Sequence, residues 1–150
     1  MSKDKFHFDE ILKELKSATR EVLVVLSNQA QNYFLESFTK QGFNGNDWKE
    51  VQRRTPGTNA YKYPKTKGLQ RRTSPILVGA GYKIRGGTLR RTVSVMARTA
   101  EISGTKLRMV VDLPYAKIQN ETRQFVGQTK ELSRIQKEEI DRIIFGLLKK

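Results

Sequence analysis

Residues 8–40 read FDEILKELKSATREVLVVLSNQAQNYFLESFTK, and an apolar residue recurs throughout this stretch in steps of three and four. That spacing places the apolar side chains along one face of an α-helix. Asp9 and Glu10 suit the positive N-terminal end of the helix. Gln41-Gly42 is expected to end it, because Gly adopts the left-handed cap conformation at little cost. At a rise of about 1.5 Å per residue the helix would reach roughly 45–50 Å, so part of its apolar face is expected to pack on a neighbouring subunit.

Further along the chain, two segments have the pattern of β-strands. Residues 92–98 and 106–113 alternate apolar and polar side chains, and Ser103-Gly104 lies between them as a turn. This pattern predicts an antiparallel hairpin with one buried face.

The C-terminal part predicts a short helix, a strand and a final helix. Pro114 suits the first turn of a helix over residues 115–120, and residues 123–127 resemble a short strand. Thr129 can cap a last helix whose apolar positions again recur in steps of three and four. The order of elements predicts a single α+β domain over residues 1–150. In this domain the long N-terminal helix and the C-terminal helix pack on a small antiparallel β-sheet.

Positive charge is concentrated in the middle of the chain. The net charge is +14, from 29 Lys and Arg against 15 Asp and Glu. Residues 41–120 hold sixteen bases and four acids, whereas residues 1–40 hold six of each. Such an excess attracts polyanions or acidic protein surfaces.

Residues 43–75 lack any apolar period and contain several Gly, Pro and Asn residues that favour turns. We therefore expect a long, flexible, basic loop, and loops of this length are usually functional or disordered. It could bind DNA phosphates without reading sequence, bind an acidic protein, or serve only as a solvated segment. The candidate contact residues for a partner or polyanion are Trp48, Arg53, Arg54, Lys62, Lys65, Lys67, Arg71, Arg72, Arg90 and Arg91. A Trp in such a position more often fills the edge of the core than contacts a partner.

The sequence shows no grouping of residues that is typical of catalysis or metal binding. There is no Cys, and His7 is the single His, so we expect neither a metal site nor a cofactor. Residues 81–88 have the glycine spacing of a phosphate loop, but Gly87 occupies the position of the required Lys. No apolar run approaches the length needed to span a membrane. We expect a protein that is not an enzyme.

Six short segments follow one another along the chain: FLESF (34–38), DWK (47–49), IL (76–77), GTLRRTV (87–93), DLPYAKIQNE (112–121) and RQFVG (123–127). Taken in this order, they resemble the Mu-like phage virion morphogenesis family. Gln119 stands where the family commonly has His, and Gln124 where it frequently has Pro.

The resemblance implies a structural protein of the virion that completes the tail or joins it to the head. It implies assembly in the host cytoplasm, a place at the phage neck, and a homo-oligomeric ring. The partners would be other neck, connector and tail proteins, with DNA in the channel as a further contact. The alternative is a sequence-independent DNA-binding protein that uses the basic loop.

Overall fold

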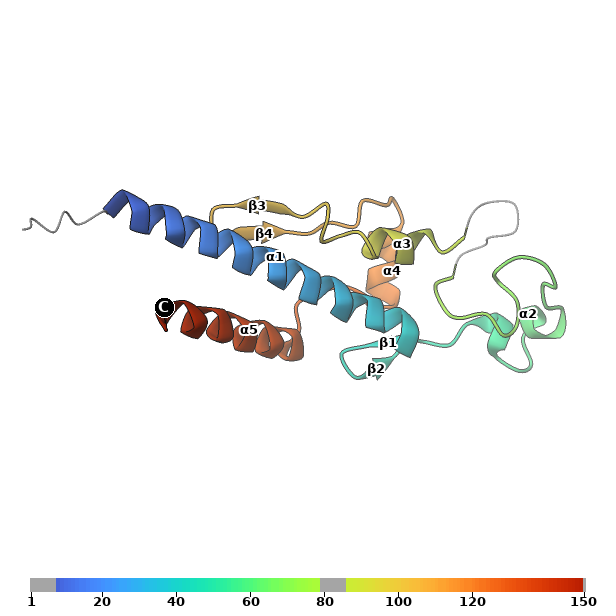
Figure 1. Ribbon diagram of the computed structural model, residues 1–150. Helices are drawn as coiled ribbons and strands as arrows, with labels where there is room; N and C mark the ends of the chain where they lie inside the picture. The colour runs from blue at the N-terminus through green and yellow to red at the C-terminus, as the bar shows by residue number, and fades with distance from the viewer. Residues whose placement is uncertain (1–7, 79–85, 150) are drawn as a thin grey trace, which may run out of the picture.

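The computed structural model describes residues 8–78 and 86–149 and shows an elongated molecule built along one long helix (Figure 1). That helix, α1 (Phe8–Lys40), carries α5 (Lys130–Leu148) on one side. On its other side lie α3 (Thr88–Val93), α4 (Ala116–Thr122) and the hairpin of β3 (Glu101–Ser103) and β4 (Lys106–Arg108). A second hairpin, β1 (Gly42–Phe43) and β2 (Asn46–Asp47), follows α1 directly. Beyond it come the 3-10 helix η1 (Gln52–Arg54) and α2 (Asn59–Lys62).

The predicted α+β class and the two long helices are confirmed. The arrangement differs in one respect, because the strands form two separate two-stranded antiparallel sheets. α5 therefore packs against α1, and α1 itself contacts β1 and β4. Thr129 caps α5 as expected, since its hydroxyl accepts a hydrogen bond from the Leu132 N–H at 3.0 Å.

The core lies where the C-terminal half of α1 meets the later elements. Phe34 and Phe38 from α1 are buried together with Trp48 and Phe125. The Phe38 ring packs edge-on against Trp48, with centroids 5.5 Å apart, and lies 5.7 Å from the Phe125 ring. The Trp48 indole N–H donates to the Gln124 carbonyl at 2.6 Å. Segments distant in sequence are thus joined by aromatic packing and one partly buried hydrogen bond.

The first predicted strand, residues 92–98, is wrong. Thr88–Val93 forms α3, and the chain continues in turns. The buried residues are Leu89, Val93 and Met96, which are spaced by four and three, whereas Val95 is 38 % exposed. The buried side chains therefore follow the helical period, and the alternation of apolar and polar residues does not correspond to a strand. The turn lies at Gly104-Thr105, one residue later than predicted, and the hairpin around it is shorter than expected, pairing Glu101 with Arg108 at its open end.

The predicted strand over residues 123–127 is also wrong, because its backbone is satisfied by a side chain. The Asn120 amide oxygen accepts the N–H groups of Phe125 and Val126 at 2.9 and 3.1 Å. These donors need no partner strand.

The end of α1 falls where the sequence predicts, but Gly42 is not the left-handed residue. Gln41 takes that conformation, with φ of 52°. Gly42 is required for a different reason: a Cβ there would lie 2.6 Å from the Asn46 carbonyl oxygen across the β1–β2 hairpin. The glycine therefore permits a close approach of two backbones.

Gly42→Ala is expected to lower the free energy of unfolding by about 1–3 kcal/mol, because the added methyl forces the hairpin apart. Gly146→Ala is the matched control. It lies in α5 with nothing within 4 Å of its added Cβ, so it should raise stability by up to about 1 kcal/mol. Urea unfolding of the two variants measures both effects. Equal stabilities would contradict the close approach at Gly42.

Candidate functional site

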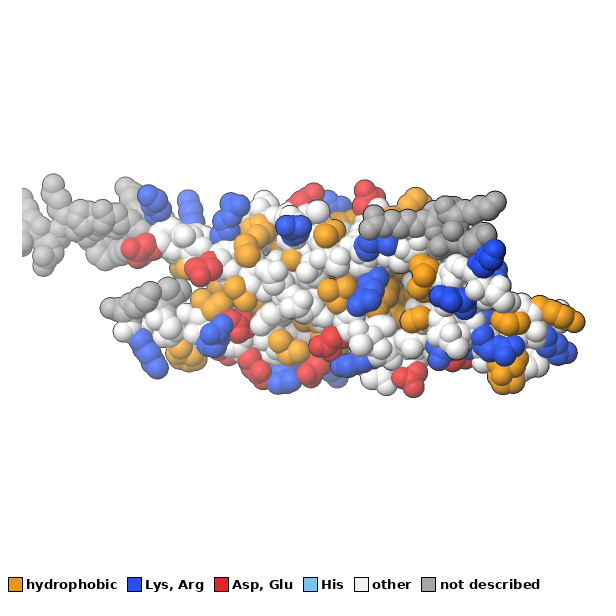
Figure 2. Space-filling model, turned by 45° about the vertical axis from the view of Figure 1, so that its right-hand side comes forward, with side chains coloured by type: hydrophobic (Ala, Val, Ile, Leu, Met, Phe, Trp, Pro, Cys, Tyr) orange, Lys and Arg blue, Asp and Glu red, His pale blue; other side chains and the backbone are white. Residues whose placement is uncertain are grey.

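Residues 49–78 form a basic lobe at the end of the molecule opposite the N-terminus of α1 (Figure 1). The lobe holds eight Lys and Arg residues against one acid, Glu50. Blue side chains gather at this end of the surface (Figure 2). The segment expected as a loop contains η1 and α2, while its flexibility stays a prediction.

Arg53 holds the two ends of the lobe together. Its guanidinium donates to the carbonyl oxygens of Arg71 and Ser74, both at 3.0 Å, and to that of Pro75 at 2.5 Å. Partial burial, with the charges of Arg54 and Arg123 nearby, lowers the pKa of Arg53 from its ordinary value, and Glu50 opposes this. Three carbonyl acceptors use the fork geometry that only Arg offers. Arg53 therefore has a structural role.

Arg54 is also held within the fold. It donates to the Gln41 side-chain oxygen at 2.7 Å and forms an ion pair with Glu50 at 3.3 Å. The same Gln41 oxygen accepts the Ile76 N–H at 2.9 Å. Removing Arg53 and Arg54 together would loosen the lobe, so that double variant does not isolate a binding role.

In each of the other two Arg pairs, one Arg donates a hydrogen bond to a backbone carbonyl, although the one that does so in the first pair, Arg72, is itself exposed. Arg72 lies over the Tyr61 ring, 4.1 Å from its centroid, and donates to the Tyr61 carbonyl. Arg71 is exposed. On α3, outside the lobe, Arg91 donates to the Gly86 carbonyl, whereas Arg90 is exposed.

The remaining candidate residues fall into two groups. Lys62, Lys65 and Lys67 are exposed on the lobe. Trp48 is only 7 % exposed and lies in the core, which favours the alternative that it fills the core edge.

A groove opens where the lobe meets the end of α4. Among its lining residues are the cations Lys49, Arg53, Lys65 and Arg123, and one carboxylate, Glu50. The Arg123 guanidinium donates to the Lys49 carbonyl at 2.9 Å, which fixes it across the groove. The sequence pattern did not single out Lys49 or Arg123 as site residues. Arg123 lies 74 residues from Lys49, so no local pattern could have joined them.

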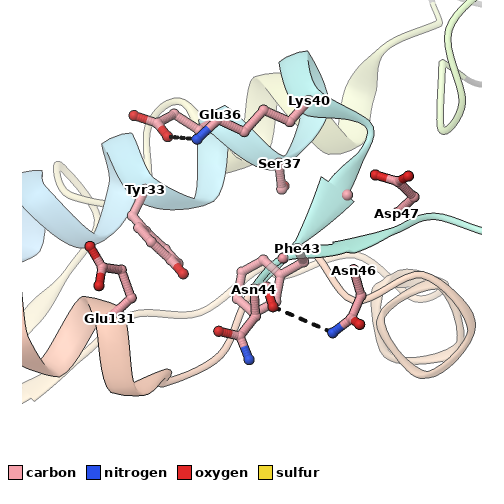
Figure 3. Close-up of a pocket in the computed structure, with 11 residues that line it drawn as sticks. Tyr33, Glu36, Ser37, Lys40, Phe43, Asn44, Asn46, Asp47 and Glu131 are labelled. Atoms are coloured by element: carbon pink, nitrogen blue, oxygen red, sulfur yellow. Dashed lines mark hydrogen bonds and ion pairs between the residues drawn. The ribbon is translucent and has the colours of Figure 1, made fainter.

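A second hollow lies between the end of α1, the β1–β2 hairpin and the start of α5 (Figure 3). Two of its three carboxylates, Glu36 and Glu131, are already paired, with Lys40 at 2.8 Å and with Arg134 at 2.7 Å, and the third, Asp47, is exposed. Arg134 holds the pKa of Glu131 below its usual value. These ion pairs are typical of a solvated helix surface and suggest no acid–base chemistry.

Within residues 8–78 and 86–149 no cluster of three or more His, Asp or Glu side chains could hold a metal ion. Across that same part of the chain, no helix has the length and apolar character needed to cross a membrane. The phosphate-loop-like segment at residues 81–88 falls mostly on residues outside those described, as does His7.

Comparison of the chain with protein-family models, with curated proteins and with solved structures finds no match.

Arg53→Lys is expected to lower local stability by roughly 1–2 kcal/mol, because Lys keeps the charge but cannot reach three carbonyl oxygens at once. Hydrogen exchange should accelerate by about tenfold in peptides covering residues 71–76. Arg71→Lys is the control, since that side chain is exposed. Unchanged exchange in the Arg53 variant would show that its hydrogen bonds do not hold the lobe.

Proposed function

We propose that this chain is a non-enzymatic structural protein of a tailed bacteriophage, which completes the tail or joins it to the head at the virion neck. It would be made in the host cytoplasm and act through protein–protein contacts, with other neck, connector and tail proteins as partners. A homo-oligomeric ring is the proposed form of the assembled protein.

The observation that carries the proposal is the meeting of the resemblance segments in one core. Residues from each segment are buried together: Phe34, Phe38, Trp48, Ile76, Leu89, Val93, Ala116 and Phe125. Residues that determine a common core are those that related chains share even when surfaces differ.

Exposed apolar side chains support assembly through protein contacts. Leu15 in the N-terminal half of α1 is 62 % exposed, and Phe145 near the end of α5 is 61 % exposed. These parts of the two helices lie at the same end of the molecule, opposite the basic lobe (Figure 1). Large apolar side chains grouped at one end favour a binding surface for another protein.

A groove beside β4 offers a second surface of this kind. Met96, Leu107, Met109 and Val111 contribute to its apolar lining. Ile118, on the neighbouring α4, is 62 % exposed. Met side chains adapt their shape to a partner, so this groove suits a contact with a neighbouring subunit.

Deletion of the gene from the phage genome that encodes it should yield DNA-filled heads separate from tails, or tails with ragged ends, in electron micrographs. Supply of the wild-type chain from a plasmid should restore joined particles. Normal, infectious particles from the deletion would contradict the proposal.

A further inference from the structure

We propose that the groove between the basic lobe and the end of α4 binds the phosphate backbone of double-stranded DNA without reading its sequence. The inference does not depend on the neck assignment, because it rests on the groove alone.

The residues that line the groove carry more positive than negative charge. Lys49, Arg53, Lys65 and Arg123 face one carboxylate, Glu50, and Glu50 already pairs with Arg54 at 3.3 Å. A concave surface lined by charges of one sign focuses its field on an approaching ligand of opposite sign. An anion is therefore the ligand that the groove fits.

The fold positions two of these four cations before any ligand arrives. The guanidinium groups of Arg53 and Arg123 are fixed by hydrogen bonds to backbone carbonyls, whereas Lys49 and Lys65 are exposed. Besides partial burial, the nearby charges of Arg54 and Arg123 lower the pKa of Arg53. A bound phosphate would relieve this repulsion, and fixed donors lose little conformational entropy on binding it.

The composition of the lobe favours a nucleic acid over an acidic protein. Protein interfaces have an apolar centre and few lysines, whereas nucleic-acid interfaces are polar and strongly positive. Among the large apolar side chains of residues 49–78, one is mostly exposed: Tyr63, which lines the groove and is 80 % exposed. A single ring gives one stacking position, while single-strand binders stack successive bases on several. Duplex DNA therefore fits better than a single strand.

Over residues 49–78, all of which the structure describes, the lobe lacks an element suited to reading bases. α2 has four residues and η1 has three, and a major groove is read by a longer helix or by a β-ribbon. Phosphate contacts fix position but carry no sequence information. Binding is therefore expected to be independent of sequence.

The test measures binding of the full chain to a labelled random duplex of roughly 30 base pairs by fluorescence anisotropy, as salt is varied. About four neutralised phosphates give a slope of about −3.6 in log K against log salt, so affinity should fall roughly 100-fold between about 50 and about 200 mM. Lys49→Ala with Lys65→Ala should make that slope shallower by about 1.8 and weaken binding at least roughly tenfold at low salt.

Lys62→Ala with Lys67→Ala is the matched control, because it removes the same charge from exposed positions of the lobe that do not line the groove. It should change the affinity by less than about threefold. Circular dichroism and thermal unfolding verify that both variants keep the fold.

Three further results would each overturn the inference. Equal losses in the two variants would assign binding to overall charge rather than to the groove. Failure of the wild-type chain to bind DNA at low salt would exclude DNA as the ligand. Polyglutamate or inorganic phosphate that displaces DNA at matched charge concentration would point instead to an acidic protein or to a free anion. Because the assay uses the purified chain, its failure leaves the outcome of the gene deletion unaffected.

Discussion

Gln41 adopts a left-handed backbone conformation directly after α1, and three segments of the chain meet on its oxygen atoms. Its carbonyl accepts the Trp48 N–H at 2.8 Å. Its side-chain oxygen accepts both the Arg54 guanidinium and the Ile76 N–H. The β1–β2 hairpin, the start of the lobe and the return of the chain to the core are thereby fixed to the end of α1. A non-Gly residue at positive φ costs of order 1 kcal/mol, which these three hydrogen bonds offset.

The basic groove depends on this arrangement because its two walls belong to different parts of the chain. The lobe wall is set by Gln41 and by Arg53, whose three carbonyl contacts close the lobe on itself. The opposite wall ends in Arg123, and the neighbouring Gln124 carbonyl accepts the Trp48 indole N–H. Core packing therefore determines the spacing of the groove cations. Arg residues hold the framework through their forked donors, while exposed Lys residues supply mobile charge.

The sequence predicted those features that depend on one continuous stretch. The apolar period of residues 8–40 and the cap at Thr129 identified α1 and α5, because helices are determined by neighbours three and four residues away. Around Val93 the apolar residues fit both the two-residue period of a strand and the spacing of four and three of a helix. The segment forms a helix because that spacing buries its apolar side chains against α1. The strand predicted at 123–127 failed because the Asn120 side chain satisfies the backbone there.

The candidate site was predictable in its charge but not in its geometry. Paired arginines drew attention as contact residues, yet Arg53 and Arg54 are engaged with the fold, through backbone carbonyls and a side-chain oxygen that lie 13 to 22 residues away in sequence. Lys49 and Arg123 face one groove only because the aromatic core brings α4 beside the lobe. Composition gives the net charge of a segment, whereas its distribution on the surface follows from tertiary contacts.

One end of the molecule exposes apolar side chains, whereas the opposite end carries the basic groove. Leu15 and Phe145 are exposed, and a contact that buried such apolar side chains against a protein partner would be little weakened by moderate salt. Phosphate binding in the groove instead depends on release of counterions and weakens as salt rises. A subunit built in this way can hold a protein neighbour at one end and DNA at the other without competition, because the two surfaces use different residues. If both proposals hold, assembly and DNA binding would be separable by ionic strength, because rising salt would release the DNA before it separates the protein neighbours.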